Sequence, residues 1–268
     1  MDFSLFLLCL IQGITEAFPV SSSGHLAFLT LFLKVDPTLF DTALHAGTLL
    51  AFMTSFPGQV QQLFIGGYDI MCGKIHTLPA QKWIFLALAT TPAILIGALL
   101  HIFHLRSASL FWMGFNSIIF GFFMGWADRY PGIFHPGTLG SGTHGSQRWW
   151  HSLVLGVGQV FAFFPGASRM GTCLTAARCL GYSRPKAFEA SFLMGIACIS
   201  SALVLKVKDI AAIGWKNFIL TTLLSFVICF PLVKGVIAFS KKYSLIPFVL
   251  YRLGLGILIL WALYKGWF

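Results

Sequence analysis

Long apolar stretches separated by short polar segments run along the whole chain. One stretch, at residues 42–56, is shorter than the five longest stretches and carries His45, so it predicts a sixth membrane span or a partial one. A helix of about 20 residues is long enough to cross the hydrocarbon core of a bilayer. The pattern therefore predicts an all-α protein that crosses a membrane several times. Five stretches have this length: residues 83–104, 108–127, 186–205, 216–238 and 245–267.

Two further apolar stretches are interrupted by proline. Residues 3–18 end at Pro19 and residues 150–164 end at Pro165, and serine and glycine residues follow each proline. Each stretch alone is shorter than the roughly 20 residues that a spanning helix needs. Together with the segment after its break, each predicts a re-entrant hairpin or a discontinuous helix. The polar segments at 57–81 and 128–148 predict loops.

The two interrupted stretches resemble each other. We interpret the resemblance as an internal duplication, with halves at residues 1–127 and 149–268 of a single membrane domain that covers residues 1–268. Broken helices at matching positions of two halves are typical of a binding site near the middle of the bilayer. The matches are Phe18, Pro19 and Ser22 with Phe164, Pro165 and Ser168, offset by 146 residues, and Phe40, Asp41 and Gly47 with Phe188, Glu189 and Gly195, offset by 148.

Composition supports the membrane assignment and limits the classes of partner. The chain is 57% hydrophobic and 10% charged, whereas soluble domains contain about 25% charged residues. Its net charge is +10, but the basic residues form no long run; they lie at segment ends, such as Arg129, Lys206, Lys241 and Lys242. There we expect them to contact lipid headgroups and not nucleic acid. The six cysteines form no Cys-x-x-Cys pair, so neither a disulfide framework nor a zinc site is indicated.

The proline breaks indicate an anion-binding site. Interrupted backbone at bilayer depth is tolerated where it is buried in protein or lines a polar cavity. The helices that begin after each break expose N–H groups and the positive ends of their dipoles, which attract anions. Serines at 21–23 and Ser168 are suited to cap these two helices. A phosphate or diphosphate between the two breaks is the ligand that this arrangement favours.

Glu16 is the first candidate for chemistry at this site. It is one of two glutamates in the chain, and an ionised glutamate inside a bilayer is costly unless it has a function or a partner. Gln12 lies four residues earlier, on the same helix face. A carboxylate beside a phosphate favours a cation between them, and Mg²⁺ or Ca²⁺ prefers oxygen ligands. Two other readings stay open: Glu16 forms a structural ion pair with Arg169, and Gln12 bonds a neighbouring helix.

Ser22, His25 and Arg169 are the other candidates. Ser22 and His25 are three residues apart, close enough for His25 to activate Ser22 or to act itself as nucleophile or acid. Arg169 follows the second break and could hold phosphate oxygens through its planar guanidinium group. His45 and Glu189 are interpreted as structural.

These residues lie in two motifs that resemble those of a known family. The segment from Gln12 to His25, Gln-Gly-Ile-Thr-Glu-Ala-Phe-Pro-Val-Ser-Ser-Ser-Gly-His, resembles the first signature of the undecaprenyl-diphosphate phosphatases, also called bacitracin-resistance proteins. Their second signature, Pro-Gly-x-Ser-Arg-Ser-Gly, is matched from Pro165 to Gly171, with Met170 in place of a serine. The order and spacing of the two motifs agree with the family over nearly the whole chain.

The resemblance implies an activity and a fold. The activity is hydrolysis of undecaprenyl diphosphate to the monophosphate and phosphate, which recycles the lipid carrier for peptidoglycan synthesis and confers bacitracin resistance. The fold is a multi-helix bundle with inverted repeats and two re-entrant helix pairs, in the bacterial cytoplasmic (inner) membrane. We expect its site to open to the outer face.

The resemblance also assigns roles to residues. It places Glu16 and Gln12 at a divalent-cation site for Mg²⁺ or Ca²⁺, and Ser22 and His25 at the nucleophile and acid positions. Substrate binding is expected from the phosphate loops, at Ser21, Gly166, Ser168, Arg169 and Gly171. Three departures from the family weaken the polar shell: the amide of Gln12 is a poorer ligand than a carboxylate, Met170 lacks a hydroxyl, and Cys173 stands where threonine is common.

One rival function stays open. Inverted repeats with broken helices are also a transporter architecture, so a transporter or flippase of a polyprenyl phosphate lipid is the alternative. The sequence does not distinguish Ser22, His25 or water as the attacking group, and it leaves a homo-oligomer open.

Overall fold

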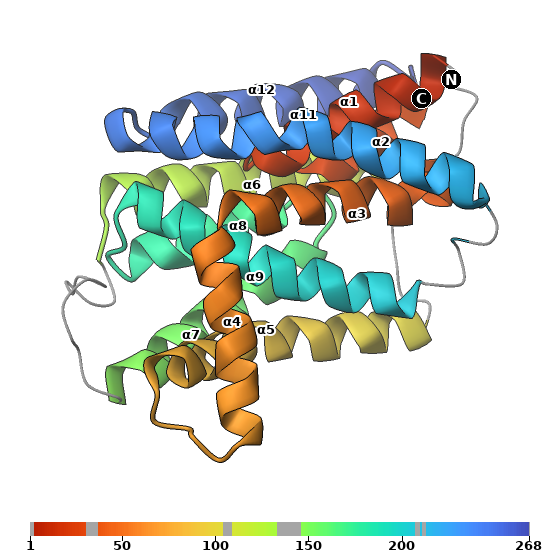
Figure 1. Cartoon of the computed structure of the whole chain (residues 1–268). Helices are drawn as coiled ribbons and strands as arrows, with labels where there is room; N and C mark the ends of the chain where they lie inside the picture. The colour runs from red at the N-terminus through yellow and green to blue at the C-terminus, as the bar shows by residue number, and fades with distance from the viewer. Residues whose placement is uncertain are drawn as a thin grey trace.

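The protein is a bundle of helices, described by a computed structural model for residues 3–30, 37–103, 109–132, 146–206, 210 and 213–267. No strand occurs in these ranges. Most of the helices lie roughly along one direction, while α4 runs across them (Figure 1). In chain order the elements are α1 Phe3–Ala17, α2 Ser22–Thr30, α3 Pro37–Ser55, α4 Pro57–Met71, α5 Leu78–Ile102, α6 Leu110–Arg129, α7 Ser146–Val160, the 3₁₀ turn η1 Phe161–Phe163, α8 Arg169–Cys179, α9 Arg184–Leu205, α11 Trp215–Lys242 and α12 Ile246–Tyr264.

The five predicted spans are confirmed as helices. α5, α6, α9, α11 and α12 are each long and apolar enough to cross a membrane. Their ends differ from the predicted ends by a few residues, and the predicted boundaries at 104 and 108 lie outside the described residues. The protein is therefore a multi-pass membrane protein. Most of the predicted loop at 128–148 also lies outside the described residues.

Two predicted segments differ from the structure. The stretch expected at 42–56 is longer, because α3 begins at Pro37, and proline is well accommodated in the first turn of a helix. The loop expected at 57–81 is wrong for its first part, which forms α4. Its glutamines and glycines suggested a loop, but Pro57 at the first turn and the apolar residues further along support a helix that packs against α5.

Both proline breaks separate two helices. The first lies between α1 and α2, and the second lies between η1 and α8. Ser21 and Ser168 immediately precede α2 and α8, and both adopt positive φ, 72° and 69°. The backbone therefore pairs Ser21 with Ser168, one residue away from the sequence match of Ser22 with Ser168, because the second break contains one more residue after its proline. The duplication and the re-entrant path of the helices stay predictions.

Apolar side chains are divided between a core and the outer surface. Phe52, Phe188 and Phe192 are fully buried where α3 and α9 meet. Many other large apolar side chains, such as Phe122 on α6 and Val227 on α11, are more than half exposed. Burial of this exposed apolar surface in a bilayer is favourable, whereas its exposure to water is not. The surface of the bundle therefore fits a lipid environment.

A cluster of charges joins four helices at the beginning of α9. The Asp128 carboxylate lies at the end of α6. It accepts hydrogen bonds from Nε of Arg178 on α8 at 3.1 Å and from Nε of Arg184 on α9 at 2.7 Å. Its other oxygen accepts from the Leu245 N–H at 3.0 Å, just before α12. The donors satisfy the hydrogen-bonding capacity of both oxygens of this buried carboxylate. The cluster fixes the relative positions of these four helix ends.

Candidate active site

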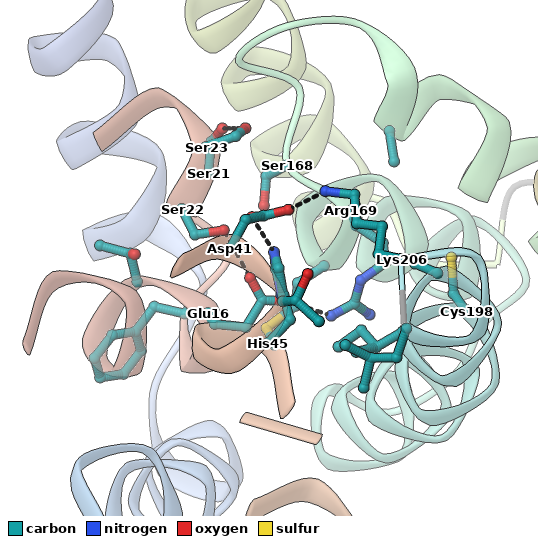
Figure 2. A pocket seen from close by; sticks show the side chains of 18 residues that line it. Glu16, Ser21, Ser22, Ser23, Asp41, His45, Ser168, Arg169, Cys198 and Lys206 are labelled. Atoms are coloured by element: carbon teal, nitrogen blue, oxygen red, sulfur yellow. Dashed lines mark hydrogen bonds and ion pairs between the residues drawn. The ribbon is translucent and has the colours of Figure 1, made fainter. Parts of the chain in front are cut away.

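A cavity of about 300 Å³ lies where α1, α2, α3, α8 and α9 meet. Its side chains come from both proline breaks, as the sequence predicts, and from the C-terminal part of α9 (Figure 2). The polar groups of its wall that bear on chemistry are Glu16, Ser22, Asp41, His45, Arg169 and Lys206.

Glu16 is the residue on which both breaks converge. Its Oε1 accepts from Arg169 at 2.7 Å, and its Oε2 accepts from the Ser22 hydroxyl at 2.6 Å. Gln12 Nε2 lies 3.4 Å from the same Oε2. The Glu16–Arg169 ion pair considered from the sequence is thus present, and it lies in the wall of the cavity. A carboxylate beside a hydroxyl and a guanidinium group can accept a proton and help to bind an anion.

His25 points to a different part of the structure. Its Nδ1 lies 2.7 Å from the Ser21 carbonyl, and its Nε2 lies 2.5 Å from the Tyr251 hydroxyl on α12. Because a carbonyl only accepts, Nδ1 carries a proton; burial lowers the pKa of His25 and favours the neutral ring, whose Nε2 accepts from Tyr251. His25 is not among the described residues that line the cavity. In this geometry it holds the first break against α12, while its proposed chemical role stays a prediction.

The second break presents Arg169 at the start of α8. Ser168 Oγ accepts from the Gly171 N–H at 3.2 Å, which confirms the predicted cap. Arg169 also donates from Nη1 to the Ser191 carbonyl of α9 at 3.2 Å. Close approach of Arg169 to α9 requires Gly195, because a Cβ there would lie 2.5 Å from Nη1. These contacts fix the guanidinium group at the cavity wall.

Gly166 and Gly171, which the sequence predicts to bind substrate, are not among the described residues that line the cavity. Gly166 has φ of 85°, and a Cβ there would lie 2.3 Å from the Met113 carbonyl of α6, so the break can approach α6 only with glycine. The N–H of Gly171 is used by the Ser168 cap. Ser21 and Ser168 both line the cavity. Substrate binding by these residues stays a prediction.

The sequence analysis missed Arg252, which is completely buried in α12. Its guanidinium group donates to the Pro19 carbonyl of the first break at 3.2 Å and to the Gly166 carbonyl of the second at 3.0 Å. One side chain thus joins the two breaks and satisfies carbonyls that helix interruption leaves open. The signal was an arginine inside the apolar stretch 245–267, since a charge at such a position usually has a specific partner.

Asp41 and His45 also belong to the cavity. His45 Nε2 lies 3.3 Å from Asp41 Oδ1, and its Nδ1 lies 3.2 Å from Gln12 Nε2. Lys206, expected at lipid headgroups, instead forms an ion pair with Asp41. The spacing of Asp41 and His45, four residues apart on one helix face, was the available signal.

The oxygen atoms present give a partial fit to a divalent cation. Gln12 is not among the described residues that line the cavity, but its Oε1 is buried beside Glu16 and has no hydrogen-bond partner among the described residues. Both Glu16 oxygens, however, already accept from Arg169 and Ser22. In the same part of the chain no three His, Cys, Asp or Glu side chains lie close enough together to hold a metal. Mg²⁺ often binds through one or two carboxylates together with substrate phosphates and water, which suits a site with so few protein ligands.

Comparison with known proteins identifies the family of the chain. The chain matches the family described as bacitracin resistance protein BacA over residues 5–258. It is 34% identical over 271 residues to a protein named undecaprenyl-diphosphatase from Ruegeria pomeroyi, covering 98% of this chain and 99% of the relative. A protein of the same name from Jannaschia sp. is 34% identical over 268 residues, covering 96% and 97%.

Proposed function

Because the chain belongs to the bacitracin resistance protein BacA family, we propose that its cavity carries out the reaction for which its relatives are named. The protein is an undecaprenyl-diphosphatase, a membrane enzyme that hydrolyses undecaprenyl diphosphate to undecaprenyl phosphate and phosphate and so recycles the lipid carrier for peptidoglycan synthesis. The transporter alternative is not favoured, since the relatives carry the name of the enzyme and the cavity contains a carboxylate in contact with both a hydroxyl and a cation.

One observation supports Ser22 as the attacking group. Its hydroxyl donates to Glu16 at 2.6 Å in a wall of the cavity that also contains Arg169. As Ser22 Oγ forms a bond to the terminal phosphorus, the bond from that phosphorus to the bridging oxygen breaks and undecaprenyl phosphate leaves. The serine proton passes to Glu16, which lies within hydrogen-bond reach.

A second step regenerates the enzyme. Water attacks the phosphoserine, the Oγ–phosphorus bond breaks, and inorganic phosphate leaves. The proton held by Glu16 passes to Ser22 Oγ as the Oγ–phosphorus bond breaks, and both protons of the attacking water leave with inorganic phosphate, so that Glu16 returns to its ionised form. Arg169 transfers hydrogen bonds from Glu16 to the phosphoryl oxygens during both steps, which stabilises their charge and frees Glu16 as a base.

A trapping experiment tests the attacking group. We expect acid quenching of the enzyme during turnover of substrate labelled in its terminal phosphate to place the label on the peptide that contains Ser22. Ser22→Ala should abolish both label and phosphate release, whereas Ser240→Ala, a serine bonded to its own helix backbone, should retain both. Label on His25, or full phosphate release by Ser22→Ala, would show that Ser22 is not the nucleophile.

We also propose that a divalent cation binds together with the substrate. Glu16 and Gln12 Oε1 would hold it, with the remaining ligands from the diphosphate and water, and it would neutralise phosphate charge. Support comes from the unpartnered Gln12 oxygen beside Glu16.

Cation dependence can be read without turnover. We expect Gln12→Ala to raise the Mg²⁺ concentration required for half-maximal binding of a non-hydrolysable diphosphate analogue by about tenfold, the loss of one ligand interaction. Gln59→Ala, on α4 and outside the cavity, is the matched control. If analogue binding is independent of Mg²⁺ in both the unmodified enzyme and Gln12→Ala, no divalent cation takes part in substrate binding.

We propose that the enzyme lies in the bacterial cytoplasmic membrane with the cavity open to its outer face. The cavity is at the C-terminal end of α9, whereas the exposed Cys72 lies before α5, whose N-terminal residues contact the opposite end of α9. A membrane-impermeant thiol reagent added to intact cells should therefore leave Cys72 unlabelled. Rapid labelling of Cys72 would show that the protein has the opposite orientation in the membrane. Whether the enzyme forms a homo-oligomer stays a prediction.

A further inference from the structure

Lys206 lies in the cavity although its sequence position suggests a lipid anchor. It follows α9 directly as the C-cap residue, and its ammonium group forms an ion pair with Asp41 Oδ2 on α3. The side chains of Lys206 and Asp41 are 25% and 29% exposed, so a ligand that enters the cavity can reach both. Figure 2 shows Lys206 and Arg169 on the same side of the cavity, facing Asp41 and Glu16.

The cavity therefore contains two matched ion pairs. Arg169 pairs with Glu16 from the two breaks, and Lys206 pairs with Asp41. His45 lies between them, since one ring nitrogen contacts Asp41 and the other contacts Gln12, which reaches Glu16. Without ligand, each cation is neutralised by a carboxylate. A ligand with two adjacent phosphoryl groups offers each of the two cations an anionic partner in place of its carboxylate.

We propose that Lys206 binds the inner, lipid-linked phosphoryl group of the diphosphate while Arg169 binds the terminal one. This proposal rests on the proposed function and adds the residue that binds the second phosphoryl group of the substrate. Breaking the bridging bond transfers negative charge to the inner phosphate, which is the leaving group, so an ammonium beside it stabilises the product as it forms. Asp41 keeps Lys206 at the cavity before substrate binds and competes with the phosphate for it.

Inorganic pyrophosphate and inorganic phosphate separate the two subsites. Both are used as competitive inhibitors of undecaprenyl diphosphate hydrolysis by the full-length enzyme in detergent, at a fixed concentration of free divalent cation. We expect Lys206→Met to weaken pyrophosphate inhibition about tenfold, the loss of one charge-assisted hydrogen bond, and to change phosphate inhibition by less than about twofold. Lys206→Arg should restore the preference for pyrophosphate, and Lys241→Met, an exposed lysine near the end of α11, should have no effect.

Asp41→Asn is expected to change pyrophosphate inhibition in the direction opposite to Lys206→Met. The amide keeps an oxygen that accepts from Lys206 but removes the competing charge, so pyrophosphate inhibition should become several-fold stronger. If Lys206→Met does not fold, Asp41→Asn and Lys206→Arg still test the proposal. Weaker pyrophosphate inhibition by Asp41→Asn would overturn the proposal.

Failure of this inference can be distinguished from failure of the active-site assignment. Arg169→Met should weaken inhibition by both pyrophosphate and phosphate. If it does so while Lys206→Met affects neither, or affects both equally, the second subsite is wrong and the active site stands. If Arg169→Met leaves both inhibitors unchanged, the cavity is not the active site.

Discussion

Glu16→Gln is expected to lower kcat about 10³-fold, within the range for loss of a general base. The amide cannot take the Ser22 proton, although it fills the same space and can still accept a hydrogen bond from Ser22. The measurement is phosphate release from undecaprenyl diphosphate at saturating substrate. Substrate affinity should change less than kcat, because the phosphate still has Arg169, which is no longer held by a carboxylate.

The chain offers a matched control in its other glutamate. Glu189 on α9 accepts from Gln59 at 2.9 Å and pairs with Lys186 at 3.0 Å, outside the cavity. Glu189→Gln should retain activity within about twofold, as expected of a partly exposed pair. Glu16→Gln also leaves Arg169 buried without its carboxylate, so its thermal unfolding in detergent must be recorded alongside. A folded Glu16→Gln enzyme with normal kcat would remove Glu16 from the chemistry.

Arg252→Met is expected to reduce both stability and activity. The change leaves carbonyls of Pro19, Gly166 and Ser117 without a charged donor in a buried site. At about 1–3 kcal/mol for each unsatisfied group, we expect a total loss of about 3 kcal/mol or more. The two breaks lose their common link, so kcat should fall about 10²-fold, as for misplacement of catalytic groups by about 1 Å.

Thermal unfolding in detergent and phosphate release measure these effects separately. Arg129→Met removes an exposed arginine at the end of α6 and should change neither. Arg252→Lys keeps the charge but can reach fewer carbonyls, so its losses should be intermediate. An Arg252→Met enzyme with the unfolding temperature and kcat of the unmodified protein would show that the link between the breaks is dispensable.

Local sequence signals predicted the parts of the site that lie on neighbouring residues. Pro19 lies between Glu16 near the end of α1 and Ser22 at the start of α2, and the Ser168 cap requires only the Gly171 N–H three residues later. Hydropathy located the five spans because the bilayer fixes their length. It did not find α4, whose mixture of polar and apolar residues has no such length requirement.

Contacts between distant helices could not be predicted in this way. His25 is three residues from Ser22, yet its ring turns towards Tyr251, 226 residues away along the chain. Lys206 and Asp41 are 165 residues apart, and Arg252 reaches a carbonyl 233 residues away. Helix periodicity says which face a residue occupies, but the partner on that face depends on how the bundle packs.

The Asp128 cluster has a consequence for the order in which the bundle can assemble. Asp128, Arg178 and Arg184 all precede residue 185, so their ion pairs can close before α12 is synthesised. What remains is an acceptor position on Asp128 that the Leu245 N–H fills at 3.0 Å. The last helix of the chain, which carries Tyr251 and Arg252 to the two breaks, thus meets a docking point that is already charged and oriented. We expect α12 to dock after these ion pairs have formed and to place Arg252 between the carbonyls of Pro19 and Gly166.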